Sequence, residues 1–171
     1  MKLKPTIFQI SVIILLAAFA RLIPHPPNFT PIGAMALLGG MFLSGTVLPI
    51  VIPLAAVFLS DLWIGFHETM LFVYIGVVLT TFIGKWIASI TWKKTILASL
   101  LASIVFFILT NLGVWLTTGM YAPNLSGLFM CYAAAIPFFH YSLLGDLFFV
   151  SLLSGLIIFI ASFQRQPSKA V

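Results

Sequence analysis

The stretch from residue 70 to residue 116, MLFVYIGVVLTTFIGKWIASITWKKTILASLLASIVFFILTNLGVWL, decides the fold. It contains two apolar runs, 70–91 and 95–116, on either side of the turn Trp92-Lys93-Lys94. Each run has the ~20 residues that a helix needs to cross the ~30 Å hydrocarbon core of a bilayer. The stretch therefore predicts two membrane-spanning helices joined by a tight turn.

The composition of the whole chain agrees with this prediction. Of 171 residues, 62% are apolar and 6% are charged, whereas a soluble domain carries about 25% charged residues. This excludes a soluble enzyme, a nucleic-acid-binding module and a disordered chain, and it makes the lipid bilayer the expected surroundings. The single cysteine, Cys131, excludes an internal disulfide and a cysteine-based zinc site.

Breaks in the apolar pattern predict an all-α membrane protein, a six-helix transmembrane bundle in one domain that covers residues 1–171. The predicted spans are 6–23, 32–44, 46–60, 70–91, 95–116 and 142–162. A short or re-entrant helix at about 127–138 precedes the last span, because Pro137 and Gly145-Asp146 divide an apolar stretch too long for one crossing. A cleaved signal peptide ending at Ala18-Phe19-Ala20 is the less favoured alternative, because the apolar segment continues through Ile23.

The distribution of cations predicts the orientation. Six spans place both termini on the side of the 44–45 and 93–94 turns. The cations of that side are Lys2, Lys4, Lys93, Lys94, Arg165 and Lys169. Since cytoplasmic loops carry an excess of Lys and Arg, we expect a multi-pass protein of the bacterial inner (cytoplasmic) membrane with both termini in the cytoplasm.

The same topology gathers the other polar side chains at the outer face. Ionisable groups near hydrocarbon are costly, and they are retained where they pair with each other, contact water or bind a ligand. The candidate ligand-binding residues are Arg21, His25, Asn28, Asp61, Trp63, His67, Glu68, Asn111, Trp115, Phe139, His140 and Asp146. Other interpretations stay open. Loops are polar where they touch water, aromatic residues form interfacial belts, and Arg21 can pair with Asp61 or Asp146 only to join helices. Asn111 is equally well explained as a hydrogen-bonding link between helices.

Small residues recur at helical spacing and predict faces where helices pack closely. They are Gly33, Ala36 and Gly40; Gly76, Thr80 and Gly84; and Ala98, Ser99, Ala102 and Ser103. We expect them to pack within the chain, with docking to a partner subunit as the alternative.

Motifs of catalysis are missing from the sequence. There is no GxxxxGK[ST] phosphate loop and no GxSxG turn, and the run from His67 to Leu71 lacks the second histidine of an HExxH zinc helix. We therefore predict no catalytic residue, no metal site and no cofactor. An intramembrane enzyme would need a nucleophile–base pair, for which His140 and Asp146 are the only attractive candidates.

Residues 21–40, RLIPHPPNFTPIGAMALLGG, resemble the signature of a family of uncharacterised bacterial membrane proteins. That family is similar in layout to the substrate-binding S components of energy-coupling-factor (ECF) vitamin transporters. The segment 135–140, AIPFFH, followed by a final span, also resembles those proteins. The resemblance implies a bundle whose outer loops close over a vitamin-like ligand. It also implies association with a coupling transmembrane protein and ABC-type ATPases, or action alone.

The strict Ala-xxx-Ala docking motif that such proteins carry on helix one is absent from the first predicted span, because Arg21 stands four residues after Ala17. The resulting hypothesis is a membrane substrate-binding protein for uptake of a small vitamin-like nutrient, with the segment 25–30 as a lid. The alternative is a scaffold or accessory subunit of a larger membrane complex, without transport activity.

Overall fold

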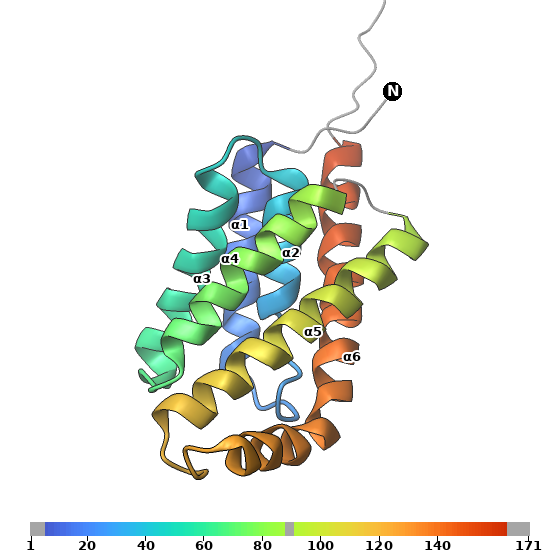
Figure 1. Cartoon of the computed structure of the whole chain (residues 1–171). Coiled ribbons are helices and arrows are strands. Elements are labelled where there is room, and N and C mark those ends of the chain that lie inside the picture. The colour runs from blue at the N-terminus through green and yellow to red at the C-terminus, as the bar shows by residue number, and fades with distance from the viewer. Residues whose placement is uncertain (1–5, 88–90, 164–171) are drawn as a thin grey trace, which may run out of the picture.

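The computed structural model describes residues 6–87 and 91–163, and within them the chain is helical and contains no strand. The elements are α1 (Ile7–Ala17), the 3₁₀ helix η1 (Ala18–Leu22), α2 (Ile32–Phe42), α3 (Leu48–Ile64), α4 (Met70–Ile87), α5 (Trp92–Thr117) and α6 (Leu125–Phe163). Successive helices run up and down one bundle (Figure 1). The predicted all-α class is confirmed, and the described residues form six α-helices.

Local sequence explains where several helices begin. Thr6 caps α1 in a capping box: its hydroxyl accepts from the backbone N–H of Gln9 at 3.3 Å, and the Gln9 side chain accepts from the N–H of Thr6 at 2.9 Å. Thr91 caps α5 by accepting from the backbone N–H of Lys94. Pro49 lies in the first turn of α3, where a missing N–H costs no helical hydrogen bond.

Helix α2 is the centre of the bundle. All residues from Ile32 to Gly40 are buried, and α2 contacts α1, α3, α4, α5 and α6. Its 11 residues reach only ~16 Å at 1.5 Å per residue, which is short of a membrane crossing. Because its neighbours surround it, the short helix faces protein on all sides.

The predicted small-residue faces are buried inside the bundle. The tightest approach joins α2 to α4. A Cβ on Gly40 would overlap the backbone of Thr81, and a Cβ on Gly84 would overlap the backbone of Leu37. The two helices therefore meet backbone to backbone, as small residues allow, and the prediction of packing within the chain is confirmed.

The last part of the chain differs from the prediction. The expected separate helix at 127–138 and the span at 142–162 belong to one helix, α6, with Pro137 inside it. Figure 1 shows the first part of α6 lying across the lower end of the bundle and the rest rising beside α5. Proline lacks the N–H of the helical hydrogen bond and its ring crowds the preceding turn, which bends a helix without always ending it.

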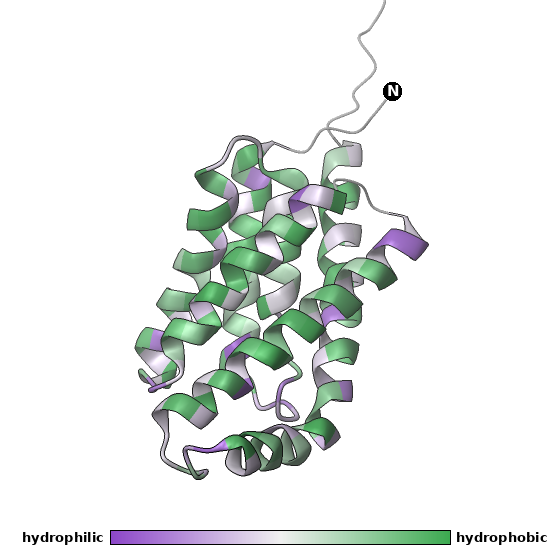
Figure 2. Cartoon of the chain, in the orientation of Figure 1, coloured by the Kyte–Doolittle hydropathy of each residue, from purple (hydrophilic) through white to green (hydrophobic). Residues whose placement is uncertain are grey.

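Three helices, α4, α5 and α6, are long and apolar enough to cross a membrane. The shorter apolar helices are Ile7–Leu22, Ile32–Phe42 and Leu48–Ile64. Most of the ribbon is coloured as hydrophobic (Figure 2), and large hydrophobic side chains such as Trp86 and Phe129 are exposed. These features indicate a membrane protein.

Candidate functional site

A cavity of about 310 Å³ lies between the loop before α2, the start of α4, the second half of α5 and the rising part of α6. These segments meet toward the lower end of the bundle in Figure 1. The lining residues are Asn28, Thr30, Ile32, Gly33, Thr69, Val73, Phe106, Phe107, Thr110, Asn111, Val114, Ser142 and Asp146. They combine one carboxylate, two amides and several hydroxyls with aromatic and aliphatic walls, which is the composition of a small-molecule pocket.

Asp146 is the buried acid of this cavity, with 5% of its surface exposed. Its Oδ2 accepts a hydrogen bond from the hydroxyl of Ser103 on α5 at 2.6 Å. Its carboxylate also lies directly against Gly33 of α2, where any Cβ would overlap it. Because Gly33 has no side chain, it leaves space for the Asp146 carboxylate of α6 at the cavity.

Asn111 lines the cavity from α5. Its Nδ2 donates to the carbonyl of Phe107 one turn earlier, at 2.8 Å. No hydrogen bond to its side-chain oxygen is present within residues 6–87 and 91–163. The amide thus holds its own orientation through the helix and leaves an acceptor at the cavity.

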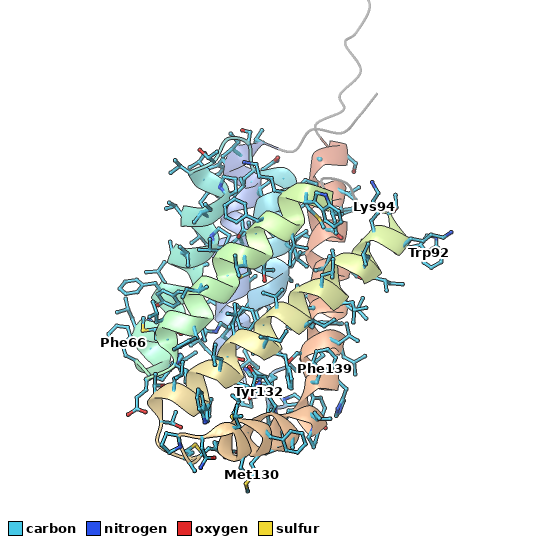
Figure 3. The ribbon with its side chains drawn as sticks, in the orientation of Figure 1. Phe66, Trp92, Lys94, Met130, Tyr132 and Phe139 are labelled. Atoms are coloured by element: carbon cyan, nitrogen blue, oxygen red, sulfur yellow. The ribbon has the colours of Figure 1, made fainter. Side chains whose placement is uncertain are left out.

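Aromatic rings hold the first part of α6 against α5. The ring of Phe107 meets Phe139 edge-on at a centroid distance of 5.4 Å, and Tyr132 at 5.7 Å. The hydroxyl of Tyr132 donates to the carbonyl of Ile108 at 2.7 Å. Figure 3 shows Tyr132 and Phe139 on the side of α5, whereas Met130 points away from the bundle. The first part of α6 therefore packs against α5 beside the cavity, where it contacts the lining residue Phe107.

The loop before α2, which contains the predicted lid at residues 25–30, is fixed to α6 by Phe29. The ring of Phe29 lies 5.7 Å from that of Phe148 and 5.6 Å from that of Phe149. Asn28 beside it adopts φ 64°, a left-handed conformation that asparagine tolerates better than most residues. In this conformation Asn28 lines the cavity.

Arg21 and Asp61 form a separate buried cluster that does not line the cavity. Nη2 of Arg21 lies 2.8 Å from Oδ1 of Asp61, and the two side chains form an ion pair. The geometry of this contact does not meet the criteria for a hydrogen bond. Nη1 of Arg21 donates to the carbonyl of Val57 at 3.1 Å and to the hydroxyl of Ser60. The hydroxyl of Tyr74 donates to Oδ2 of Asp61 at 3.1 Å. The cluster joins η1, α3 and α4, so its geometry matches the alternative of a pair that joins helices.

The other predicted residues also lie outside the cavity lining. Trp63 is 82% exposed, and His25, His67, Glu68 and His140 are exposed as well. Trp115 donates through Nε1 to the carbonyl of Ala122 at 2.9 Å and so ties the end of α5 to the following loop. Of the twelve predicted residues, the structure brings Asn28, Asn111 and Asp146 together around the cavity.

Sequence reasoning did not identify several residues of the cavity, among them Phe106, Phe107, Thr110 and Ser142. Phe107 precedes Asn111 by four residues and Ser142 precedes Asp146 by four, so each shares a helix face with a predicted residue. That spacing is the signal that would have found Phe107 and Ser142. Within the described ranges, no group of three His, Cys, Asp or Glu side chains could hold a metal ion.

The fold and the cavity together define an all-helical membrane protein with a small pocket lined by polar, aromatic and aliphatic side chains. The chain belongs to DUF6580, a family of unknown function, whose family model matches residues 1–169. No curated protein and no solved structure matches the chain.

Proposed function

We propose that this protein captures a small organic nutrient for uptake, binding it in the cavity between α2, α4, α5 and α6. The observation that carries the proposal is the lining, in which the Asp146 carboxylate and the Asn111 amide face the same space as the rings of Phe106 and Phe107. Apolar walls with a few converging polar groups bind and orient small molecules. A vitamin-like compound fits this description.

The orientation is part of the proposal. The cavity lies toward the extracytoplasmic face, and both termini lie in the cytoplasm of a bacterial cell. This is supported by Lys85, Lys93 and Lys94, which belong to the end of α4 and the start of α5 at the upper end in Figure 1, away from the cavity. Cations concentrate on the cytoplasmic side of membrane proteins.

A labelling experiment tests the orientation. Because Cys131 is buried, it gives little background with a membrane-impermeant maleimide. We expect the maleimide to label Glu68→Cys in intact spheroplasts and Lys93→Cys only after lysis, since both native side chains are exposed but lie at opposite ends. Labelling of Lys93→Cys in intact spheroplasts, with Glu68→Cys protected, would reverse the proposed orientation.

Binding is tested first by mass spectrometry of small molecules that co-purify with the protein in mild detergent. We expect Asn111→Ala to weaken binding of the co-purified compound by about 5- to 150-fold, because losing a hydrogen bond to the ligand costs about 1–3 kcal/mol. Trp63→Ala, a truncation outside the cavity, is the matched control and should leave affinity unchanged.

The competing function, a scaffold subunit without a ligand, predicts a different result in the same preparation. A stable partner protein and no small molecule would contradict capture and favour the scaffold. Unchanged affinity in Asn111→Ala, with the compound still bound, would remove this amide from the site.

A further inference from the structure

Among the described residues, Asp146 is the only ionisable side chain in the cavity lining. It is buried, and its one hydrogen bond within the described chain comes from the neutral hydroxyl of Ser103. The single ion pair among residues 6–87 and 91–163 joins Arg21 to Asp61 and does not include Asp146. The charge of this carboxylate is therefore not balanced by a cation of the described chain.

The described cations are engaged elsewhere. Arg21 contacts Asp61, Val57 and Ser60. Nζ of Lys85 donates to the carbonyl of Gly45 at 2.8 Å, and Nζ of Lys93 lies 5.3 Å from the centre of the Trp92 ring. Lys94 lies in the first turn of α5, where Figure 3 shows it beside Trp92, far from Met130 at the lower end. None of them lines the cavity.

A buried carboxylate without a counter-charge is costly, and pairing with a hydrogen-bonding cation offsets part of that cost. The rest of the lining suits a cation as well. The faces of phenylalanine rings attract positive charge, and Phe106 and Phe107 line the same cavity. Hydroxyl oxygens and the Asn111 carbonyl oxygen accept hydrogen bonds from N–H groups. All these groups favour a ligand that donates hydrogen bonds and carries a positive charge.

We infer that the ligand is a small organic cation whose ammonium or similar nitrogen group binds Asp146, with its apolar part against Phe106 and Phe107. This inference rests on the proposed function and names its substrate class. The volume of about 310 Å³ lies at the lower end of the ~300–1,000 Å³ range of small-molecule pockets. The cavity thus accommodates a compound with a single ring and a short nitrogen-bearing chain.

The test compares three probes that share a phenylethyl group and differ in charge: phenethylammonium, the neutral 2-phenylethanol and the anionic 3-phenylpropanoate. Each is measured by displacement of the co-purified compound and by the melting temperature of the wild-type protein in detergent. We expect the cation to bind at least tenfold more tightly than the alcohol, and the anion not to bind. This comparison needs no variant and so does not depend on how a variant folds.

The variant Asp146→Asn keeps the shape of the side chain and removes its charge. We expect it to lower affinity for the cation at least tenfold and to leave affinity for the alcohol within twofold. Glu68→Gln, the same change at an exposed position outside the cavity, is the matched control and should bind all probes like the wild type. Size-exclusion chromatography checks that each variant is folded.

The outcomes separate the inference from the function on which it rests. If the alcohol or the anion binds as tightly as the cation or more tightly, the inference that the ligand is a cation is wrong. The proposed function, capture of a small molecule, would not be affected by that result. Unchanged cation affinity in a folded Asp146→Asn would lead to the same conclusion. Failure of all three probes to bind, together with the absence of any co-purified compound, would overturn the proposed function itself.

Discussion

Gly84→Ala is expected to destabilise the protein by about 3 kcal/mol, the upper end of the range for overpacked sites. A Cβ on Gly84 would overlap the backbone of Leu37 in α2. A backbone carbonyl inside a helix cannot rotate away as a side chain can, so α2 and α4 must separate. Because α2 is surrounded by five helices, that separation disturbs the whole bundle. Unfolding in a denaturing detergent titration measures the loss.

Gly155→Ala in α6 is the matched control for this experiment. A Cβ at Gly155 would meet no atom within 4 Å other than those of its own helix backbone and chain neighbours, and alanine is favoured over glycine inside a helix by about 1 kcal/mol. We expect this variant to be as stable as the wild type or slightly more stable. Equal stability of Gly84→Ala and Gly155→Ala would show that the close approach of α2 and α4 does not limit stability.

Asp61→Ala is expected to lower the free energy of unfolding by about 3–5 kcal/mol, the cost of removing one partner from a buried ion pair. The Asp61 side chain is 0% exposed and that of Arg21 is 9% exposed. The substitution leaves the Arg21 guanidinium buried without its acid and removes the acceptor of the Tyr74 hydroxyl. The denaturing detergent titration measures this effect as well.

The double variant Arg21→Met with Asp61→Leu separates the charge effect from the loss of packing. Replacing both members of a buried pair with apolar residues of similar size is often neutral. We therefore expect the double variant to recover most of the stability lost in Asp61→Ala. Because Asp61 does not line the cavity, the folded fraction of Asp61→Ala should keep its ligand affinity. A tenfold loss of affinity there would return Asp61 to the binding site.

The sequence was sufficient for the features that depend on composition and local pattern. Long apolar runs with few charges exclude a water-soluble surface, and small residues at helical spacing predicted the faces that α2, α4 and α5 bury. The prolines and glycines placed most of the helix boundaries. At Pro137 the same reasoning was wrong, because proline also occurs within a helix that bends, and α6 continues through it.

The candidate site shows where pattern alone becomes insufficient. Arg21, Asp61 and Asp146 are equally unusual in an apolar sequence, and nothing in their spacing tells which acid pairs with the arginine. In the structure, Arg21 on η1 reaches Asp61 on α3 at 2.8 Å, which leaves Asp146 on α6 at the cavity. Trp63 and Phe139 likewise have similar surroundings in the sequence, yet Trp63 faces outward and Phe139 packs against Phe107.

The sequence by itself determined that this protein is helical, that it has the apolar helices of a membrane protein, and which small residues its helices bury, because hydropathy and side-chain size are local properties. Only the tertiary structure decided which of its polar residues meet. Contacts such as Ser103 with Asp146, or Gly33 beside the same carboxylate, join helices far apart in the chain. They depend on how the helices cross and how α6 bends, and no local pattern encodes those angles.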